Sequence, residues 1–155
     1  MERLTRMELT LDQALHQGIE AHKAGKVLEA DRYFTAILKV QPKHSDANHN
    51  MGVLAVDFGK VETSLQFFKT ALEANPSITK YWISYVDTLI TLGRLEAAKN
   101  VLNQARSRGM EGEDFDQIEK KLASLEKNTE VNTISSKSHE PSQDQLQRLI
   151  NHCTQ

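Results

Sequence analysis

Apolar residues recur along most of the chain at the three-to-four-residue spacing of helices that bury one face. Alternation of apolar and polar residues, which is typical of strands, is scarce, and the chain has only three prolines. The pattern therefore predicts an all-α protein.

The pattern returns every 34 residues. The pair Gly25-Lys26 is found again as Gly59-Lys60, and Gly93 stands one further period along the chain. Other columns with this spacing are Gly18/Gly52, Phe34/Phe68, Pro42/Pro76, Ala30/Ser64/Ala98 and Ile37/Ala71/Ala105. A period of this length predicts stacked copies of one helical unit, each covering the apolar face of the next.

The columns have physical causes. A glycine inside a helix costs about 1 kcal/mol relative to alanine, so Gly18 and Gly52 are expected to permit close packing of the paired helix. We expect the small residues Ala30 and Ser64 to lie opposite them. The larger residues expected between neighbouring repeats are Phe34, Phe68 and Leu102.

Helix ends are also marked in the sequence. The glycines at 25, 59 and 93 stand where the first helix of each unit must stop, because a left-handed residue there is least costly as glycine. Pro42 and Pro76 end the second helices. Thr10 with Gln13 predicts a capping box for the first helix, and Ser45 an N-cap for the third.

A 34-residue period with these columns resembles the tetratricopeptide repeat family. The resemblance implies a superhelix of antiparallel helix pairs (an α-α solenoid). The third repeat has Trp82, but Val86 replaces its helix glycine and Met110 replaces its final proline. The resemblance covers three repeats, at 11–44, 45–78 and 79–112. Residues 1–10 form an N-terminal arm before them.

The C-terminal part follows a different pattern. Residues 113–127 predict a capping helix with one apolar face, made of Phe115, Ile118, Leu122 and Leu125. Residues 128–141 are polar and are expected to form a linker. Residues 142–155 predict an amphipathic helix with the stripe Leu146, Leu149, Ile150 and Cys153. This last segment also resembles the start of a truncated further repeat, so we expect an N-terminal part of a longer, multi-repeat bacterial protein.

Composition narrows the function. The 19 basic and 21 acidic residues give a net charge of −2, without the basic face typical of proteins that bind nucleic acid or anionic membranes. No apolar run has the length of a membrane span, and the start of the chain lacks the apolar core of a signal peptide. The single cysteine, Cys153, excludes an internal disulfide and a cysteine-based zinc site. We expect a cytoplasmic protein with neither nucleic acid nor membrane among its partners.

The stretch GVLAVDFGKVET, residues 52–63, superficially resembles a phosphate-binding loop. Such a loop needs four residues between its glycine and Gly-Lys, and Ser or Thr directly after the lysine. Here six residues separate Gly52 from Gly59, and Val61 follows Lys60. The stretch is therefore interpreted as a helix end, and no cofactor is predicted.

Histidines and carboxylates offer the next candidate chemistry. His22, His44, Asp46 and His49 could approach one another, but nothing in their spacing makes them converge on one point, as a metal ion requires. No Ser-His-Asp or Cys-His arrangement stands out. We predict no metal site, no catalytic residue and no enzymatic activity.

The resemblance implies instead a concave groove lined by the first helix of each repeat. Helical phasing places the following residues there: Asp12, Leu15, Ile19, His22, Lys23, Asp46, His49, Asn50, Val53, Val56, Asp57, Lys80, Ile83, Ser84, Asp87, Ile90 and Thr91. Its centre is an apolar strip made of Leu15, Ile19, Val53, Val56, Ile83 and Ile90. An exposed strip of this size is typical of an interaction site.

One known use of this groove can be compared by position. Repeats that hold the acidic tails of heat-shock chaperones have a clamp of lysine, asparagine and arginine side chains. The corresponding positions here are Leu15, Ile19, Asn50, Lys80 and Ser84. Only Asn50 and Lys80 match, and the leucine and isoleucine cannot hold a carboxylate. Chaperone-tail binding is therefore disfavoured.

We predict a scaffold that binds a protein or peptide segment, apolar or amphipathic and helical, in this groove. Two alternatives for its occupant stay open: the chain's own C-terminal helix, or that of a second copy, which would make the protein self-associate. The alternative function is that of a non-catalytic regulatory or substrate-presenting segment of a larger transferase, of glycosyltransferase or sulfotransferase type.

Overall fold

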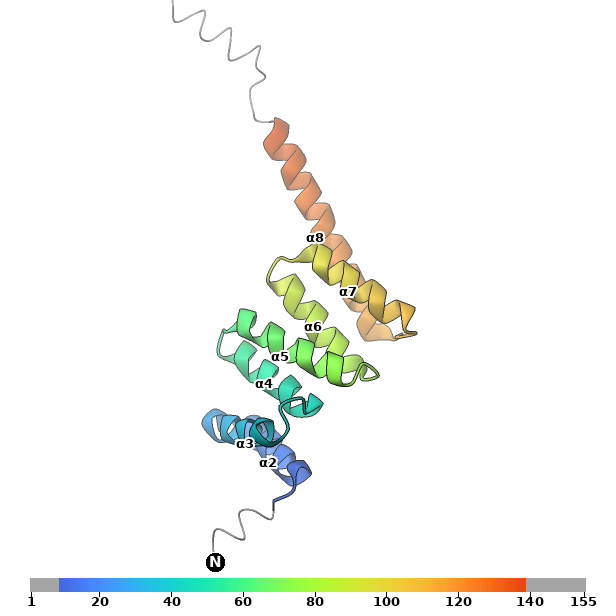
Figure 1. The fold of residues 1–155 in the computed structure, drawn as a ribbon. Helices are drawn as coiled ribbons and strands as arrows, with labels where there is room; N and C mark the ends of the chain where they lie inside the picture. The colour runs from blue at the N-terminus through green and yellow to red at the C-terminus, as the bar shows by residue number, and fades with distance from the viewer. Residues whose placement is uncertain (1–8, 139–155) are drawn as a thin grey trace, which may run out of the picture.

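The computed structural model describes residues 9–138, and every regular element in that range is an α-helix. The helices stack in chain order from the N-terminal end of the molecule to the C-terminal end (Figure 1). They are α2 (Leu11–Lys23), α3 (Val27–Val40), α4 (Ser45–Asp57), α5 (Val61–Ala74), α6 (Thr79–Thr91), α7 (Leu95–Ser107) and α8 (Glu113–Ser138). The prediction of an all-α helical-repeat superhelix is confirmed.

Three antiparallel hairpins, α2–α3, α4–α5 and α6–α7, form the body of the molecule. Each turn contains a glycine in the left-handed region, with φ of 76° at Gly25, 76° at Gly59 and 75° at Gly93. In the first turn the backbone N–H of Lys26 donates to the carbonyl of Ala21 at 2.9 Å, which closes the helix end. The predicted role of the glycine column is confirmed.

The helical glycines let an aromatic ring approach the backbone. A Cβ atom added at Gly18 or Gly52 would lie 2.5 Å from Cε1 of Phe34 or Phe68, respectively. Both rings are buried. The atoms nearest to the glycines belong to the phenylalanine rings. The placement of Ala30 and Ser64 opposite the glycines stays a prediction.

Two neighbouring junctions use the same hydrogen bond with different residues. Asn48 Nδ2 donates to the carbonyl of Pro42 at 3.0 Å, and Trp82 Nε1 donates to the carbonyl of Pro76 at 2.8 Å. Each bond ties the inter-repeat turn to the first helix of the following hairpin. The two donors, Asn48 and Trp82, are 34 residues apart, and their side chains have only an N–H group in common.

The helix starts differ from the prediction at one place. The Thr10 capping box with Gln13 is present. For α4, however, the N-cap is His44, whose Nδ1 accepts from the backbone N–H of Ala47 at 3.1 Å. Ser45, the predicted cap, is the first residue inside the helix.

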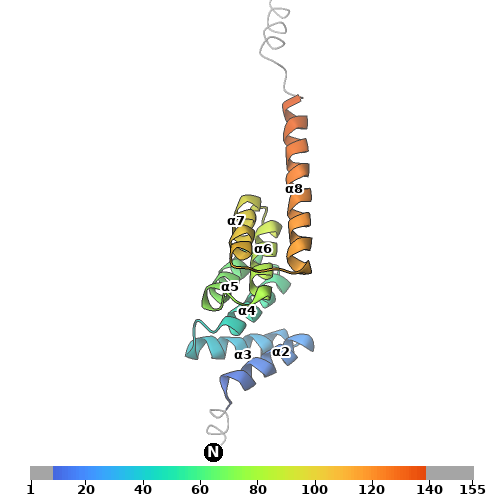
Figure 2. The same cartoon turned by 90° about the vertical axis from the view of Figure 1, so that its right-hand side faces the viewer.

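Helix α8 packs in the position of a fourth first helix. Phe115, Ile118 and Leu122 are buried in the same core cluster as residues of α6 and α7. The helix continues past the hairpins to Ser138 (Figure 2). The predicted linker is therefore wrong over 128–138. The physical reason is that the next position of the turn-glycine column is Lys127, so nothing ends the helix there.

Other predictions fall outside the described residues. They concern the arm before Leu9, the end of the expected linker at 139–141, and the amphipathic helix at 142–155.

Candidate partner-binding groove

The first helices of the hairpins form one face of the molecule. Helix α2 contacts α4, and α6 contacts α8, in addition to the contacts between consecutive helices. Polar side chains join each first helix to the next, through His22–Asp57, Asp46–Tyr81, His49–Ser84 and Asp87–Lys121. Each pair is separated by 34 or 35 residues. Helix α8 therefore extends the face that the three repeats begin.

His49 lies at the centre of this face. Its Nε2 is 2.8 Å from Ser84 Oγ, and its ring lies against the rings of Phe68 and Tyr81, with centroid distances of 5.4 and 5.1 Å. Burial, and then the positive charge of Lys80, lower the pKa of His49 to about 4, with Asp46 acting in the opposite direction. The imidazole is consequently neutral at pH 7.

Asp46 joins α4 to α6. Its carboxylate accepts from the hydroxyl of Tyr81 and lies 3.6 Å from Lys80 Nζ. Burial and the hydrogen bond to Asp46 raise the pKa of Tyr81 to about 12, so the phenol keeps its proton. The Asp46 backbone carbonyl accepts from Asn50 Nδ2 at 2.8 Å.

The two ends of the face carry more exposed pairs. His22 Nε2 lies 2.6 Å from Asp57 Oδ2, and Lys121 Nζ lies 2.7 Å from Asp87 Oδ1. Lys121 was not among the predicted groove residues, because residues 113–127 were interpreted only as a cap. Its position 34 residues after Asp87 was the available signal.

The members of the predicted apolar strip differ in burial. Val56 is 41% exposed, while the half-buried members are Leu15, Ile19, Val53 and Ile83. Ile90 is only 6% exposed and belongs to the core cluster. Its placement in the groove was therefore wrong, because α6 turns that position towards α7 and α8.

Besides Asn50, three of the predicted polar groove residues make no hydrogen bond or ion pair to a neighbouring first helix among the described residues. Lys23 Nζ lies 3.4 Å from Glu20 of its own helix, and the hydroxyl of Thr91 donates to the carbonyl of Asp87 at 2.9 Å. Asp12 is exposed in the first turn of α2. These residues lie at the margins of the face.

A hollow of about 440 Å³ lies between α6 and α8. Ile83, Ser84 and Asp87 line it from α6, and Gln117 and Lys121 from α8. It adjoins His49 through the Ser84 hydrogen bond. The face thus continues past the third hairpin as a recess lined by both apolar and polar side chains.

The histidines considered for a metal site are used separately. His44 caps α4, His22 faces Asp57, and His49 faces Ser84. In the described part of the chain, no group of three His, Cys, Asp or Glu side chains is arranged to hold a metal ion. Among the same residues, no helix combines the length and the apolar character needed to cross a membrane.

Stacked antiparallel hairpins with a shared face of first helices define a helical-repeat protein. The family profile described as "Tetratricopeptide repeat" matches residues 45–78 and 79–105. Two adjacent repeats, residues 45–78 and 79–105, are thus assigned to the tetratricopeptide repeat family. No curated protein matches the sequence.

Solved structures share the fold. A tetratricopeptide repeat protein from Parabacteroides merdae is 18% identical, with a TM-score of 0.70, over 86% of this chain and 54% of that chain. The TPR2B domain of yeast Sti1, in complex with pHsp70, is 17% identical, with a TM-score of 0.66, over 74% of this chain and 97% of that one. A mutant O-GlcNAc transferase from Thermobaculum terrenum is 24% identical, with a TM-score of 0.56, over 61% of this chain. The match spans only 18% of that transferase.

Proposed function

We propose that this protein is a non-catalytic interaction module that holds a peptide or helical segment of a partner protein on the face formed by α2, α4, α6 and α8. The observation that carries the proposal is the apolar strip between paired polar margins, with Val56 41% exposed at its centre. Apolar side chains at an open, continuous surface favour burial by a partner.

The chemistry of the face favours an apolar or amphipathic segment. His49, Asp46 and Asp87 already have hydrogen-bond or ionic partners on neighbouring helices. A ligand that competed for these groups would first have to break bonds within the protein. Contact with Val53 and Val56 breaks no such bond, and a helix with apolar residues one turn apart would cover both side chains.

The same face disfavours an acidic tail as ligand. The yeast Sti1 domain with this fold is in complex with pHsp70. Of the two residues here that match a chaperone-tail clamp, Lys80 lies 3.6 Å from Asp46, and Asn50 bonds the backbone of its own helix. Leu15 and Ile19, half-buried and apolar, stand at two other clamp positions.

Selection from a displayed library of amphipathic and acidic peptides tests the proposal. We expect the full chain to enrich peptides with apolar residues at helical spacing. Val56→Asp should weaken their binding at least tenfold. Val40→Asp is the matched control, because Val40 is 72% exposed on α3, away from the face, and should leave binding unchanged. Enrichment of acidic tails, or equal binding by Val56→Asp, would contradict the proposal.

A second candidate is a non-catalytic regulatory or substrate-presenting segment of a larger transferase. It is supported by the structural similarity to the O-GlcNAc transferase from Thermobaculum terrenum, of which the match spans 18%. Sequencing the gene beyond Gln155 tests it: an open reading frame that continues into a transferase domain supports this candidate, and a stop codon rules it out. A cytoplasmic location is proposed with either candidate, on the single cysteine of the chain.

A further inference from the structure

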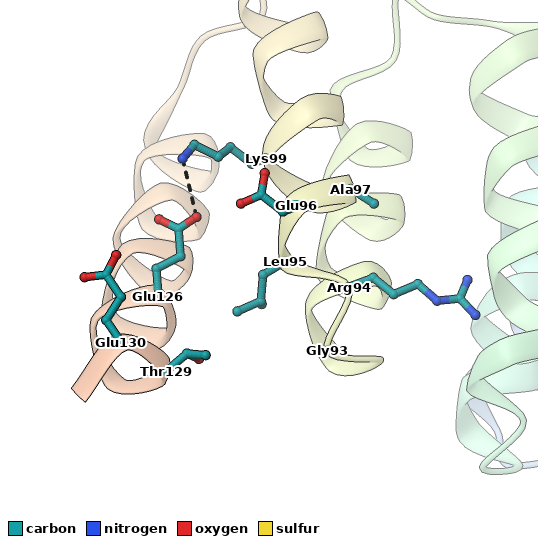
Figure 3. Close-up of a pocket in the computed structure, with 9 residues that line it drawn as sticks. All are labelled: Gly93, Arg94, Leu95, Glu96, Ala97, Lys99, Glu126, Thr129 and Glu130. Atoms are coloured by element: carbon teal, nitrogen blue, oxygen red, sulfur yellow. Dashed lines mark ion pairs between the residues drawn. The ribbon is translucent and has the colours of Figure 1, made fainter. Parts of the chain in front are cut away.

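A crevice of about 630 Å³ opens between the start of α7 and the second half of α8 (Figure 3). Leu95 and Ala97 of α7, both half-buried, line one wall. Glu126 and Glu130 of α8 line the other, and Lys99 Nζ bridges to Glu126 at 3.5 Å. The crevice lies outside the face of first helices described above.

The crevice lies beside the place where α8 does not turn as the earlier first helices do. One period earlier, the space beside the start of α5 is taken by the turn from α6 to α7, whose Arg94 donates to Glu62 at 2.6 Å. The turn glycine of that hairpin is Gly93, and its counterpart in α8 is Lys127. Helix α8 continues straight, and the place of a returning chain is left open.

We propose that residues 142–155 fold back as a helix antiparallel to α8 and occupy this crevice. The reach of the chain supports this occupant. At 1.5 Å per residue, a helix over 142–155 is about 21 Å long, and a turn at 139–141 would bring it back along α8 to the level of Ser124. The crevice, at Glu126–Glu130, falls within that span.

The chemistry of the segment fits the crevice. Its apolar stripe is Leu146, Leu149, Ile150 and Cys153. A helix of this length is marginal in water by itself, so the stripe gains from contact with Leu95 and Ala97. Glu130 has no ion-pair partner within the described residues, and the segment carries Arg148. An acidic wall and a basic residue at the same level complement each other.

The reach also separates this occupant from the alternative in which the chain covers its own groove. Helix α8, Glu113–Ser138, is about 39 Å long and runs away from α2 and α4 in both views (Figures 1 and 2). Residues 142–155, as a returning helix of about 21 Å, would lie along the second half of α8 and beside the start of α7. The proposed docking therefore leaves Val53 and Val56 open to a partner, and it does not depend on what that partner is.

The single cysteine provides the test. In the full chain, Glu126→Cys and, from the α7 side, Lys99→Cys are expected to form an intramolecular disulfide with Cys153 under mild oxidation. Gln66→Cys, exposed on α5, is the control and should stay reduced. The products are distinguished by mass and by mobility on non-reducing gels, and circular dichroism confirms that each variant is folded.

A second substitution keeps the result specific to the apolar stripe. Ile150→Asp in the Glu126→Cys background should lower the disulfide yield at least tenfold, whereas Asn151→Asp, on the polar side of the same segment, should not change it. Absence of the disulfide in both the Glu126→Cys and the Lys99→Cys variants overturns the proposal. A disulfide that forms only between two molecules also overturns it, because it assigns the crevice to the tail of a second copy.

Discussion

The hairpins α4–α5 and α6–α7 have the same fold but fill it with different residues. Position 52 is glycine with Phe68 packed against it, and the corresponding position 86 is valine, with Leu102 in place of the phenylalanine. Phe68, Val86 and Leu102 are all buried. The first of these hairpins pairs a small residue with a large one, whereas the second pairs two residues of medium size. The two positions together fill a shared volume, and the residue type at each position can differ between repeats.

The largest expected effect comes from exchanging one half of such a pair. Gly52→Val would place its side chain 2.5 Å from the Phe68 ring and should lower the free energy of unfolding by about 3 kcal/mol. Gly52→Val combined with Phe68→Leu recreates the arrangement of Val86 and Leu102, and should recover at least half of that loss. Chemical denaturation of the two variants measures both values.

Phe68→Leu alone is the control for this pair. It should cost about 1–2 kcal/mol, because it leaves space beside Gly52. If the double variant is destabilised by the sum of the two single changes, the residues are not coupled, and the interpretation of the column as a shared volume fails.

A second difference between the hairpins lies at position 49, which is histidine in α4 and isoleucine, Ile83, in α6. The pKa of His49 falls to about 4 on folding, from 6.5. The unfolded chain thus binds the proton more readily, and stability is lost as pH falls from about 6.5 towards 4. Between pH 7.5 and 5 the loss from this group should be about 2 kcal/mol.

His49→Leu gives α4 the apolar residue type found at Leu15 and Ile83. Urea denaturation at pH 7.5 and at pH 5 should show that the variant lacks most of this pH-dependent loss. An equal loss in the variant and in the wild type would assign the acid sensitivity to other groups.

The turns are where the two hairpins should respond alike. Gly59 and Gly93 have φ of 76° and 75°, and a side chain there would meet no neighbouring atom within 4 Å. Only backbone strain remains, so Gly59→Ala and Gly93→Ala should each cost about 1–2 kcal/mol. Thermal or chemical denaturation of both variants tests this, and a difference larger than about 1 kcal/mol would show that the turns are not equivalent.

The smallest effect is expected at the ion pair that joins the hairpins. Arg94 donates to Glu62 at 2.6 Å, but both side chains are about half exposed or more. Solvent screening limits such a pair to less than about 1 kcal/mol. Arg94→Met should therefore change the midpoint of denaturation little, and a double-mutant cycle with Glu62→Gln measures the pair itself.

The sequence was sufficient for the repeat and for its turns, because both depend on residues that act locally. Gly25, Gly59 and Gly93 end helices through their own backbone freedom. The 34-residue period then places each hairpin on the next. The face of first helices followed from the same phasing and the family resemblance.

The errors concern properties that depend on neighbours. Ile90 was expected on the open face, but the contacts of α6 with α7 and α8 bury it. The end of α8 could not be fixed from composition, since polar residues after Lys127 continue a helix as readily as they form a linker. His44 replaced Ser45 as a cap because its ring reaches the backbone N–H of Ala47 from the turn.

Hydrogen exchange of the full chain, with and without a selected peptide, tests whether partners bind on the face of first helices. Binding on this face should add protection in α4 and α6, centred on Val53 and Ile83, and leave α3, α5 and α7 unchanged. Protection confined to the second helices, or to the crevice between α7 and α8, would contradict it.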